Sequence, residues 1–197
     1  SQASNLILGS ELLENFSSTS DETKNNFSTW VQGNYEESNY FENLDKSLDS
    51  FSSEEPEINY KVTNDDNGLY IYTSGTTGNP KAANISHKRL RLMMLGFKGA
   101  IQPNKNDRVY NVLPLYHSAG GVIAVGLALT AGASLVLKRK FSVNEFWDDV
   151  HKYQVTIFQY IGELCRYLLN APYHKYEKDH KLRMVTGNGL RPDIWDD

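Results

Sequence analysis

The segment most capable of chemistry is a run of ten residues, Tyr-Thr-Ser-Gly-Thr-Thr-Gly-Asn-Pro-Lys, at positions 72–81. Its glycines let backbone N–H groups turn toward anionic oxygens, its hydroxyls donate further hydrogen bonds, and its lysine adds a positive charge with three donors. This combination predicts a loop that holds phosphate groups. The residues assigned to the phosphate loop are Tyr72, Thr73, Ser74, Gly75, Thr76, Thr77, Gly78 and Lys81.

Other interpretations of this loop fit the residues less well. A Walker A loop has four residues between its glycines and a Lys-Ser/Thr pair directly afterwards, whereas two residues separate Gly75 from Gly78 and Asn-Pro precedes Lys81. A Ser-Lys dyad of Ser74 and Lys81 would not need the neighbouring glycines and hydroxyls. A flexible linker would not need the apolar, strand-like residues that come directly before the loop.

The distribution of charge favours an anionic ligand in the second part of the chain. The whole chain has 20 basic and 24 acidic side chains, a net charge of −4 that argues against general nucleic-acid binding. Residues 1–59 hold 12 acidic and 2 basic side chains, whereas residues 60–197 hold 12 acidic and 18 basic ones. The single cysteine, Cys165, cannot form an intramolecular disulfide or a thiolate zinc cage, which favours a reducing, cytosol-facing location.

Hydrophobic patterning predicts alternating strands and helices, and therefore a layered, mainly parallel α/β fold with flanking helices. Strands are predicted over residues 6–8, 27–31, 69–72, 108–112, 134–137, 156–159 and 182–185. Helices are predicted over residues 11–16, 41–51, 87–99, 122–129, 143–153 and 161–169. Ser86 is the predicted N-cap of the third of these helices, residues 17–26 are predicted to be a surface loop, and residues 81–85 are predicted to be extended.

Residues 119–137 could be mistaken for a membrane span. These 19 residues carry no charge and are followed by Lys-Arg-Lys, a common flank of a transmembrane helix. However, four glycines interrupt the segment, and Ala131, Gly132 and Ala133 are typical of the turn between a helix and a strand. The segment is therefore predicted to be a buried helix, turn and strand, and any membrane contact is expected to be peripheral.

A second motif supports a specific family. Leu-Pro-Leu-Tyr-His-Ser-Ala-Gly, at positions 113–120, follows a predicted strand and begins 32 residues after Lys81. These two motifs, in this order, resemble the adenylate-forming superfamily of acyl-CoA synthetases, luciferases and peptide-synthetase adenylation domains. The segments 158–168 and 187–191 are more narrowly similar to its fatty acid transport protein branch, the very-long-chain acyl-CoA synthetases. The resemblance covers about residues 58–197, whereas the acidic residues 1–57 are assigned mostly by their position before the loop.

The resemblance implies that the chain is an incomplete portion of the large N-terminal domain of such an enzyme, with the C-terminal domain absent. It implies a ligase that activates a long- or very-long-chain fatty acid with ATP to acyl-AMP and then transfers the acyl group to CoA. The expected partners are thus fatty acid, ATP and CoA, with Mg²⁺ bound by a residue outside this chain and no metal ligand within it. The expected location is the cytoplasm or the cytoplasmic membrane face.

The resemblance also assigns roles to residues. Lys81 and His117 are the implied catalytic residues: Lys81 and the loop hydroxyls would hold the β- and γ-phosphates, and His117 would lie beside the acyl and pantetheine path. A flat backbone wall against adenine would be formed by Gly187, Asn188 and Gly189. The chain alone is expected to be inactive, and a non-catalytic nucleotide- or acyl-binding module is the alternative function.

The remaining reactive residues favour structural roles. His117 and Ser118 lack the Gly-x-Ser-x-Gly context of a hydrolase nucleophile. A metal site of His174, Asp179 and His180 is disfavoured, because the surrounding Tyr-Glu-Lys sequence is typical of a solvated helix end or loop. Cys165 lies on an apolar helical stripe, and Glu163 with Arg166 is predicted to be a surface pair one helical turn apart.

Overall fold

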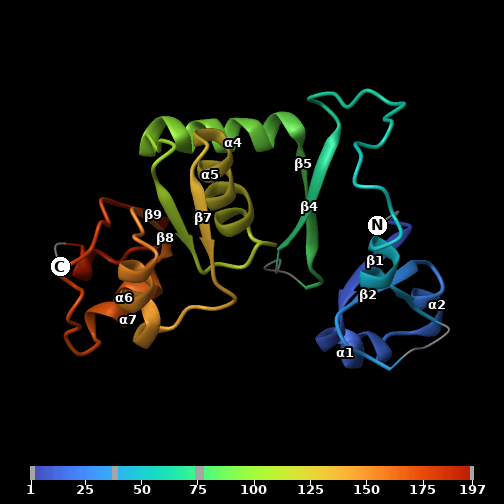
Figure 1. Ribbon diagram of the computed structural model, residues 1–197, viewed down its shortest axis with the longest axis horizontal. Helices are drawn as coiled ribbons and strands as arrows, with labels where there is room; N and C mark the ends of the chain where they lie inside the picture. The colour runs from blue at the N-terminus through green and yellow to red at the C-terminus, as the bar shows by residue number, and fades with distance from the viewer. Residues whose placement is uncertain (1–2, 37–39, 74–77, 196–197) are drawn as a thin grey trace. The chain divides into compact units, whose positions relative to one another are not determined.

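The computed structural model describes residues 3–36, 40–73 and 78–195. The chain divides into two compact units, Ser1–Tyr60 and Lys61–Asp197, which have separate sheets (Figure 1). Parallel pairs make up the sheet of the first unit and the larger sheet of the second. The predicted class, a mainly parallel α/β fold, is therefore confirmed.

The first unit is a parallel sheet in the order β1-β2-β3 with short helices. Its strands are β1 (Asn5–Gly9), β2 (Ser28–Gln32) and β3 (Glu42–Asn43). Its helices are the 3-10 turn η1 (Ser10–Leu12), α1 (Leu13–Ser17), α2 (Asp21–Lys24) and α3 (Leu44–Leu48). Phe16 and Val31 are buried within this unit.

Two helical predictions for the first unit were too long or too regular. The helix predicted over residues 11–16 begins as the 3-10 turn η1, and the helix predicted over residues 41–51 is reduced to α3. Asn43 accounts for the second difference, because its side chain accepts the N–H of Lys46 at 3.0 Å and caps the helix there. Sheet pairing of Asn43 with Val31 keeps the preceding residues extended.

The predicted surface loop over residues 17–26 also needs correction, since it contains α2. The ammonium of Lys24 donates to the carbonyl oxygen of Ser17 at 2.9 Å and to the carboxylate of Asp21 at 3.2 Å. These polar contacts close a helical turn that has no apolar periodicity, so a pattern search could not find it.

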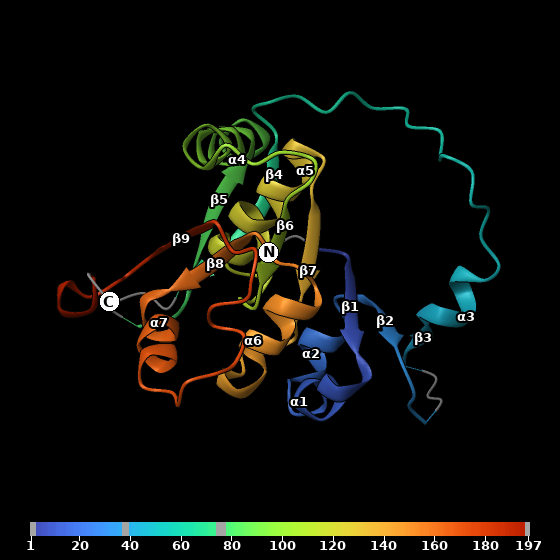
Figure 2. The same cartoon turned by 60° about the vertical axis from the view of Figure 1, so that its left-hand side comes forward.

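The second unit combines an antiparallel hairpin with a parallel sheet. The hairpin is β4 (Asn67–Thr73) with β5 (Lys81–Ser86). The sheet has the order β7-β6-β8-β9, so that β6 lies between β7 and β8 (Figure 2). Its strands are β6 (Arg108–Asn111), β7 (Ser134–Leu137), β8 (Ile157–Ile161) and β9 (Met184–Asn188).

Helices of the second unit follow the predicted order along the chain. They are α4 (His87–Ile101), the π-helical turn η2 (Ser118–Ala124), α5 (Val125–Ala131), α6 (Val143–Lys152), α7 (Gly162–Leu169) and the 3-10 turn η3 (Pro192–Ile194). Ser86 is the N-cap of α4 as predicted, and its hydroxyl accepts the N–H of Arg89 at 3.3 Å.

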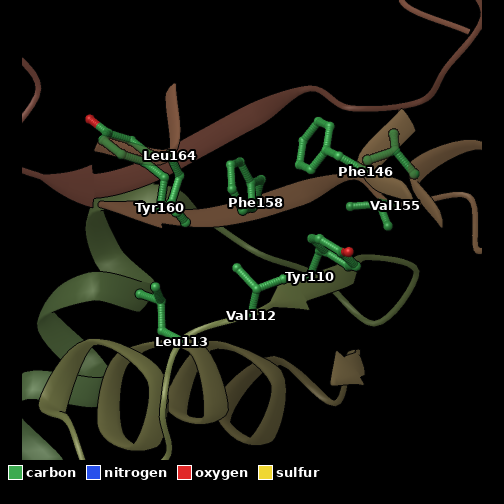
Figure 3. Packing of buried hydrophobic residues seen from close by; sticks show 9 residues of the cluster. Tyr110, Val112, Leu113, Phe146, Val155, Phe158, Tyr160 and Leu164 are labelled. Carbon is green, nitrogen blue, oxygen red and sulfur yellow. The ribbon is translucent and has the colours of Figure 1, made fainter. Parts of the chain in front are cut away.

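Successive side chains along the strands of the parallel sheet pack into hydrophobic clusters on its two opposite faces. Val109 and Ile157 pack in one cluster with residues of α5, and residues of α4 lie against this cluster. The next residue on each strand, Tyr110 and Phe158, packs on the other side with α6 and α7. There the ring of Phe146 lies 4.9 Å from that of Phe158 (Figure 3). The parallel sheet is thus buried on both faces, as is usual for parallel sheets.

Residues 119–137 form the predicted helix, turn and strand, although the helix begins with the π-helical turn η2. α5 ends at Gly132, whose φ of +65° reverses the chain into β7. In the described ranges of the chain, no helix has both the length and the hydropathy needed to cross a membrane.

Candidate functional site

The phosphate loop predicted from the sequence connects the two strands of the hairpin. Thr73 ends β4, Lys81 begins β5, and the two are register partners. The hydroxyl of Thr73 donates to the carbonyl oxygen of Lys81 at 3.4 Å. Gly78 has a φ of +131°, a conformation that requires glycine. The other predicted loop residues, Ser74, Gly75, Thr76 and Thr77, lie outside the described residues.

The side chain of Lys81 is exposed at the start of β5. None of the ion pairs between described residues involves its ammonium. The extended segment predicted over residues 81–85 is confirmed as β5. Lys81 is therefore held by strand pairing through its backbone, and its charge is available to an anion.

A pocket of about 340 Å³ brings His117 together with the strand that leads into the phosphate loop. Tyr72, which the sequence assigned to the loop, is one of its lining residues and is 58% exposed. The complete lining is Leu69, Tyr70, Ile71, Tyr72, Leu115, Tyr116, His117 and Val122. His117 was expected to face the same cleft as the loop, and it shares this pocket with β4.

The turn that carries His117 is closed tightly against η2. The N–H of His117 donates to the carbonyl oxygen of Pro114 at 3.1 Å. The N–H of Gly121 donates to the carbonyl oxygen of His117 at 2.7 Å. A Cβ on Gly120 would lie 2.6 Å from the Pro114 oxygen, and a Cβ on Gly121 would overlap the backbone of Leu115. These glycines are required because the backbone of the turn lies directly on them.

Asn111, which the sequence motifs did not single out, is hydrogen-bonded to the backbone of this turn. Its side chain is fully buried and bonds to both ends of the segment, at Leu113 and at Gly120. A polar residue between the apolar pairs Val109-Tyr110 and Val112-Leu113, just before the motif at 113–120, was a signal that could have identified it.

The third predicted segment is exposed backbone at the end of β9. Gly187 and Asn188 pair with Tyr160 and Ile161 of β8, and Gly189 follows with a φ of +72°. A Cβ on Gly187 would collide with Tyr160. The backbone is therefore bare on a strand end, a surface that a flat ring can approach closely.

His117 and the glycine segment lie toward the same edge of the sheet. Strands β6 and β9 are both parallel to β8, His117 follows β6, and Gly187 to Gly189 form the end of β9. Ligands of parallel α/β sheets gather beyond the carboxyl ends of the strands. The parallel strands thus bring two of the three predicted segments toward the same edge, and the hairpin meets one of them, His117, in the pocket described above.

Beside this edge, Lys138 follows β7 and is neutralised by carboxylates. Its ammonium lies 2.8 Å from Asp149 and 3.3 Å from Glu145, and the hydrogen bond to Asp149 raises the pKa of Lys138. The buried hydroxyl of Tyr110 also donates to Asp149, at 2.8 Å, and burial raises the pKa of Tyr110. These groups form a structural network, so the charge of Lys138 is already matched.

The remaining reactive residues have structural surroundings. Glu163 and Arg166 form the predicted ion pair on α7. Cys165 packs against the core on α7, and burial raises the pKa of its thiol. No group of three or more metal-ligating side chains occurs among residues 3–36, 40–73 and 78–195, and that includes the two histidines at 174 and 180.

Comparisons with known proteins agree with the sequence motifs. Residues 3–197 match the model of the AMP-binding enzyme family. Long-chain fatty acid transport protein 3 of Mus musculus is 53% identical over 131 residues, which are 66% of this chain and 20% of that protein. The chain therefore spans about a fifth of the length of this curated relative.

Solved structures show the same fold. The inhibitor-bound N-terminal domain of FACL13 from Mycobacterium tuberculosis has a TM-score of 0.79 at 21% identity, covering 96% of this chain and 46% of that one. ATP-bound MatB from Rhodopseudomonas palustris has a TM-score of 0.76 at 21% identity, covering 95% and 36%. The resemblance drawn from the motifs is confirmed, and the chain belongs to the AMP-binding enzyme family.

Proposed function

We propose that the protein containing this chain is an AMP-forming ligase that joins a long- or very-long-chain fatty acid to CoA. The observation that carries the proposal is the pocket shared by His117 and β4, the strand that enters the phosphate loop. The family match and the similarity to a fatty acid transport protein support the same chemistry. The apolar side chains of the pocket, such as Leu69 and Leu115, offer a surface for an alkyl chain.

In the first step, a carboxylate oxygen of the fatty acid attacks the α-phosphorus of ATP. The bond from that phosphorus to the oxygen bridging the β-phosphate breaks, and pyrophosphate leaves with the electron pair. Lys81 and the loop residues would bind the β- and γ-phosphates, where negative charge accumulates as the bond breaks. His117 would orient the carboxylate beside the α-phosphate.

In the second step, the CoA thiol gives its proton to water and its sulfur attacks the acyl carbonyl carbon. The bond between that carbon and the phosphate oxygen breaks, and AMP leaves. Gly187, Asn188 and Gly189 would hold the adenine against exposed backbone through both steps. ATP would enter as its magnesium complex, with the metal ligand expected outside this chain, and the residues of this chain would contribute hydrogen bonds and charge.

The proposal is tested by replacing Lys81 in an active framework. The chain is placed in the full-length mouse relative in place of the matching residues, and the two half-reactions are measured separately with ATP, oleate and CoA. Lys81→Ala should slow adenylation by about 30- to 1000-fold, equivalent to roughly 2–4 kcal/mol, because a charge-assisted contact to the phosphates is lost. Transfer from preformed oleoyl-AMP to CoA should be nearly unchanged, since the triphosphate is absent.

Lys88→Ala is the matched control, because Lys88 is also an exposed lysine of this unit but lies on α4. Equal losses in both half-reactions would mean that Lys81 supports the fold, and its phosphate role would be rejected. A folded graft without ATP–pyrophosphate exchange would contradict the ligase. If the chain alone nevertheless bound ATP, the alternative function, a non-catalytic nucleotide-binding module, would be supported.

A further inference from the structure

We propose that Asn111 is a positioning residue, which fixes His117 in the orientation needed for adenylation. The inference rests on the proposed function and deepens it, because it names the group that aligns the site. Asn111 does not line the pocket that contains His117. It acts through the backbone of the turn between the two residues.

Asn111 is held in place by the strands on both sides of it. It is the last residue of β6 and pairs with Leu137 of β7 and with Gln159 of β8. Its carbonyl oxygen accepts the N–H of Lys138 at 3.0 Å, and its side chain has no measurable exposure. A side chain in the middle of a sheet, with neighbours on both sides, has little freedom to move.

The amide of Asn111 bonds to both ends of the segment that carries His117. Its Oδ1 accepts the N–H of Leu113 at 3.1 Å, and its Nδ2 donates to the carbonyl oxygen of Gly120 at 3.3 Å. Between these two points the chain makes the turn in which His117 N–H reaches Pro114. The buried amide therefore fixes the start and the end of the turn, and His117 is exposed between them.

Asparagine suits this place because one planar group supplies an acceptor and a donor. Leucine has a similar size but would remove both bonds and leave the N–H of the buried Leu113 without this acceptor. Serine could still accept from the residue two positions later but is too short for the second bond. We therefore expect Asn111→Leu to displace His117 more than Asn111→Ser does.

Gln159 offers a matched control on the neighbouring strand. It is 1% exposed, it is the register partner of Asn111, and its Oε1 has no hydrogen-bond partner among the described residues. Gln159→Leu therefore removes a buried amide at the same level of the sheet, yet no described hydrogen bond links its Oε1 to the His117 turn. An effect of Asn111→Leu that Gln159→Leu does not share belongs to that turn.

The first measurement uses the chain itself and needs no activity. The imidazole signal of His117 is assigned by NMR from its loss in His117→Ala. Asn111→Leu should shift or broaden this signal while that of His151, on α6, stays in place, and Asn111→Ser should do so less. Gln159→Leu should leave the His117 signal unchanged. An unchanged signal in Asn111→Leu, or one moved equally by Gln159→Leu, would overturn the proposal.

The second measurement is a double-mutant cycle in the grafted full-length enzyme. Asn111→Leu should lower kcat for adenylation roughly 10- to 100-fold, the effect of a misplaced group, with little change in KM for ATP. In the His117→Ala background the same substitution should have almost no further effect. Equal losses in both backgrounds would make Asn111 a merely structural residue.

The two measurements separate the possible failures. A folded wild-type graft without exchange would reject the proposed function, and the NMR comparison would still decide whether Asn111 positions His117. An active graft in which His117→Ala has no effect would reject the role of His117 in the reaction. If Asn111→Leu did not fold, Asn111→Ser would decide in both measurements.

Discussion

The two edges of the parallel sheet in the second unit differ in how they use polar groups. At the amino edge, Asp107, Thr156 and Arg183 directly precede β6, β8 and β9, and they bond to one another. The carboxylate of Asp107 accepts from Thr156 at 2.7 Å and from Arg183 at 2.9 and 2.6 Å. At the carboxyl edge, His117 and the segment from Gly187 to Gly189 are exposed.

This difference shows where the fold is stabilised and where it stays open. Asp107 is 3% exposed, and its hydrogen bonds, that from Arg183 above all, lower its pKa to about 2. Its bonds join residues that are up to 76 positions apart in the chain. The carboxyl edge instead has close backbone contacts between glycines and turns, and His117 and the end of β9 are exposed there. The amino edge is thus suited to stability and the carboxyl edge to binding.

The largest effect on stability is expected from breaking the amino edge. Asp107→Ala should lower the free energy of unfolding by about 3 kcal/mol, because Thr156 and Arg183 lose a buried acceptor. Urea unfolding of the chain measures the change, and a loss below about 1 kcal/mol would contradict the anchoring role. ATP binding at urea concentrations below the unfolding transition should persist if the two edges are independent.

Acid should weaken the same edge. The pKa of Asp107 is about 2 in the folded chain against an ordinary 3.8, so its contribution is fully present above about pH 4 and is lost as the pH falls toward 2. The size of this component is on the order of 2 kcal/mol. Urea unfolding measured between about pH 4 and pH 2 should show this loss of stability in the wild type and not in Asp107→Asn. An equal dependence on pH in both proteins would assign it to other carboxylates.

A methyl group should disturb the carboxyl edge where the backbones touch. A Cβ on Gly162 would overlap the backbone of Gly189, so Gly162→Ala should cost about 2 kcal/mol and displace the end of β9. Gly96 is the control, since nothing lies within 4 Å of a Cβ there on α4. Gly96→Ala should stabilise the helix by about 0.5–1 kcal/mol. Thermal unfolding measures the stability of both variants. Equal effects of Gly162→Ala and Gly96→Ala would contradict the close contact between Gly162 and Gly189.

A smaller effect than at Asp107 or Gly162 is expected at Gln159, which lies between the two edges. Its buried Oε1 has no partner among the described residues, so Gln159→Leu should raise the free energy of unfolding by about 1 kcal/mol. Urea unfolding with the wild type as reference is sensitive enough for this change. A destabilised variant would show that Oε1 has a partner in solution.

Much of the second unit could be predicted because its signals are local. The β-rich run before the phosphate loop became β4, Ser86 capped α4, and residues 134–137 became β7. Each of these signals depends on neighbours within a few residues, such as alternation, a capping side chain or a turn glycine. The first unit was predicted less well, because the side chains of Lys24 and Asn43 decide α2 and the start of α3.

The candidate site shows the same limit. The residue types in the phosphate loop, the His117 motif and the glycine segment indicated their chemistry and their family from the sequence alone. The pocket between β4 and His117, the bonds of Asn111 and the Asp107 network became visible only in the tertiary structure. Sequence determines what each short segment can form, since backbone geometry and side-chain chemistry act locally. Which segments meet depends on how the buried faces of strands and helices pack, and that packing joins residues far apart in the chain.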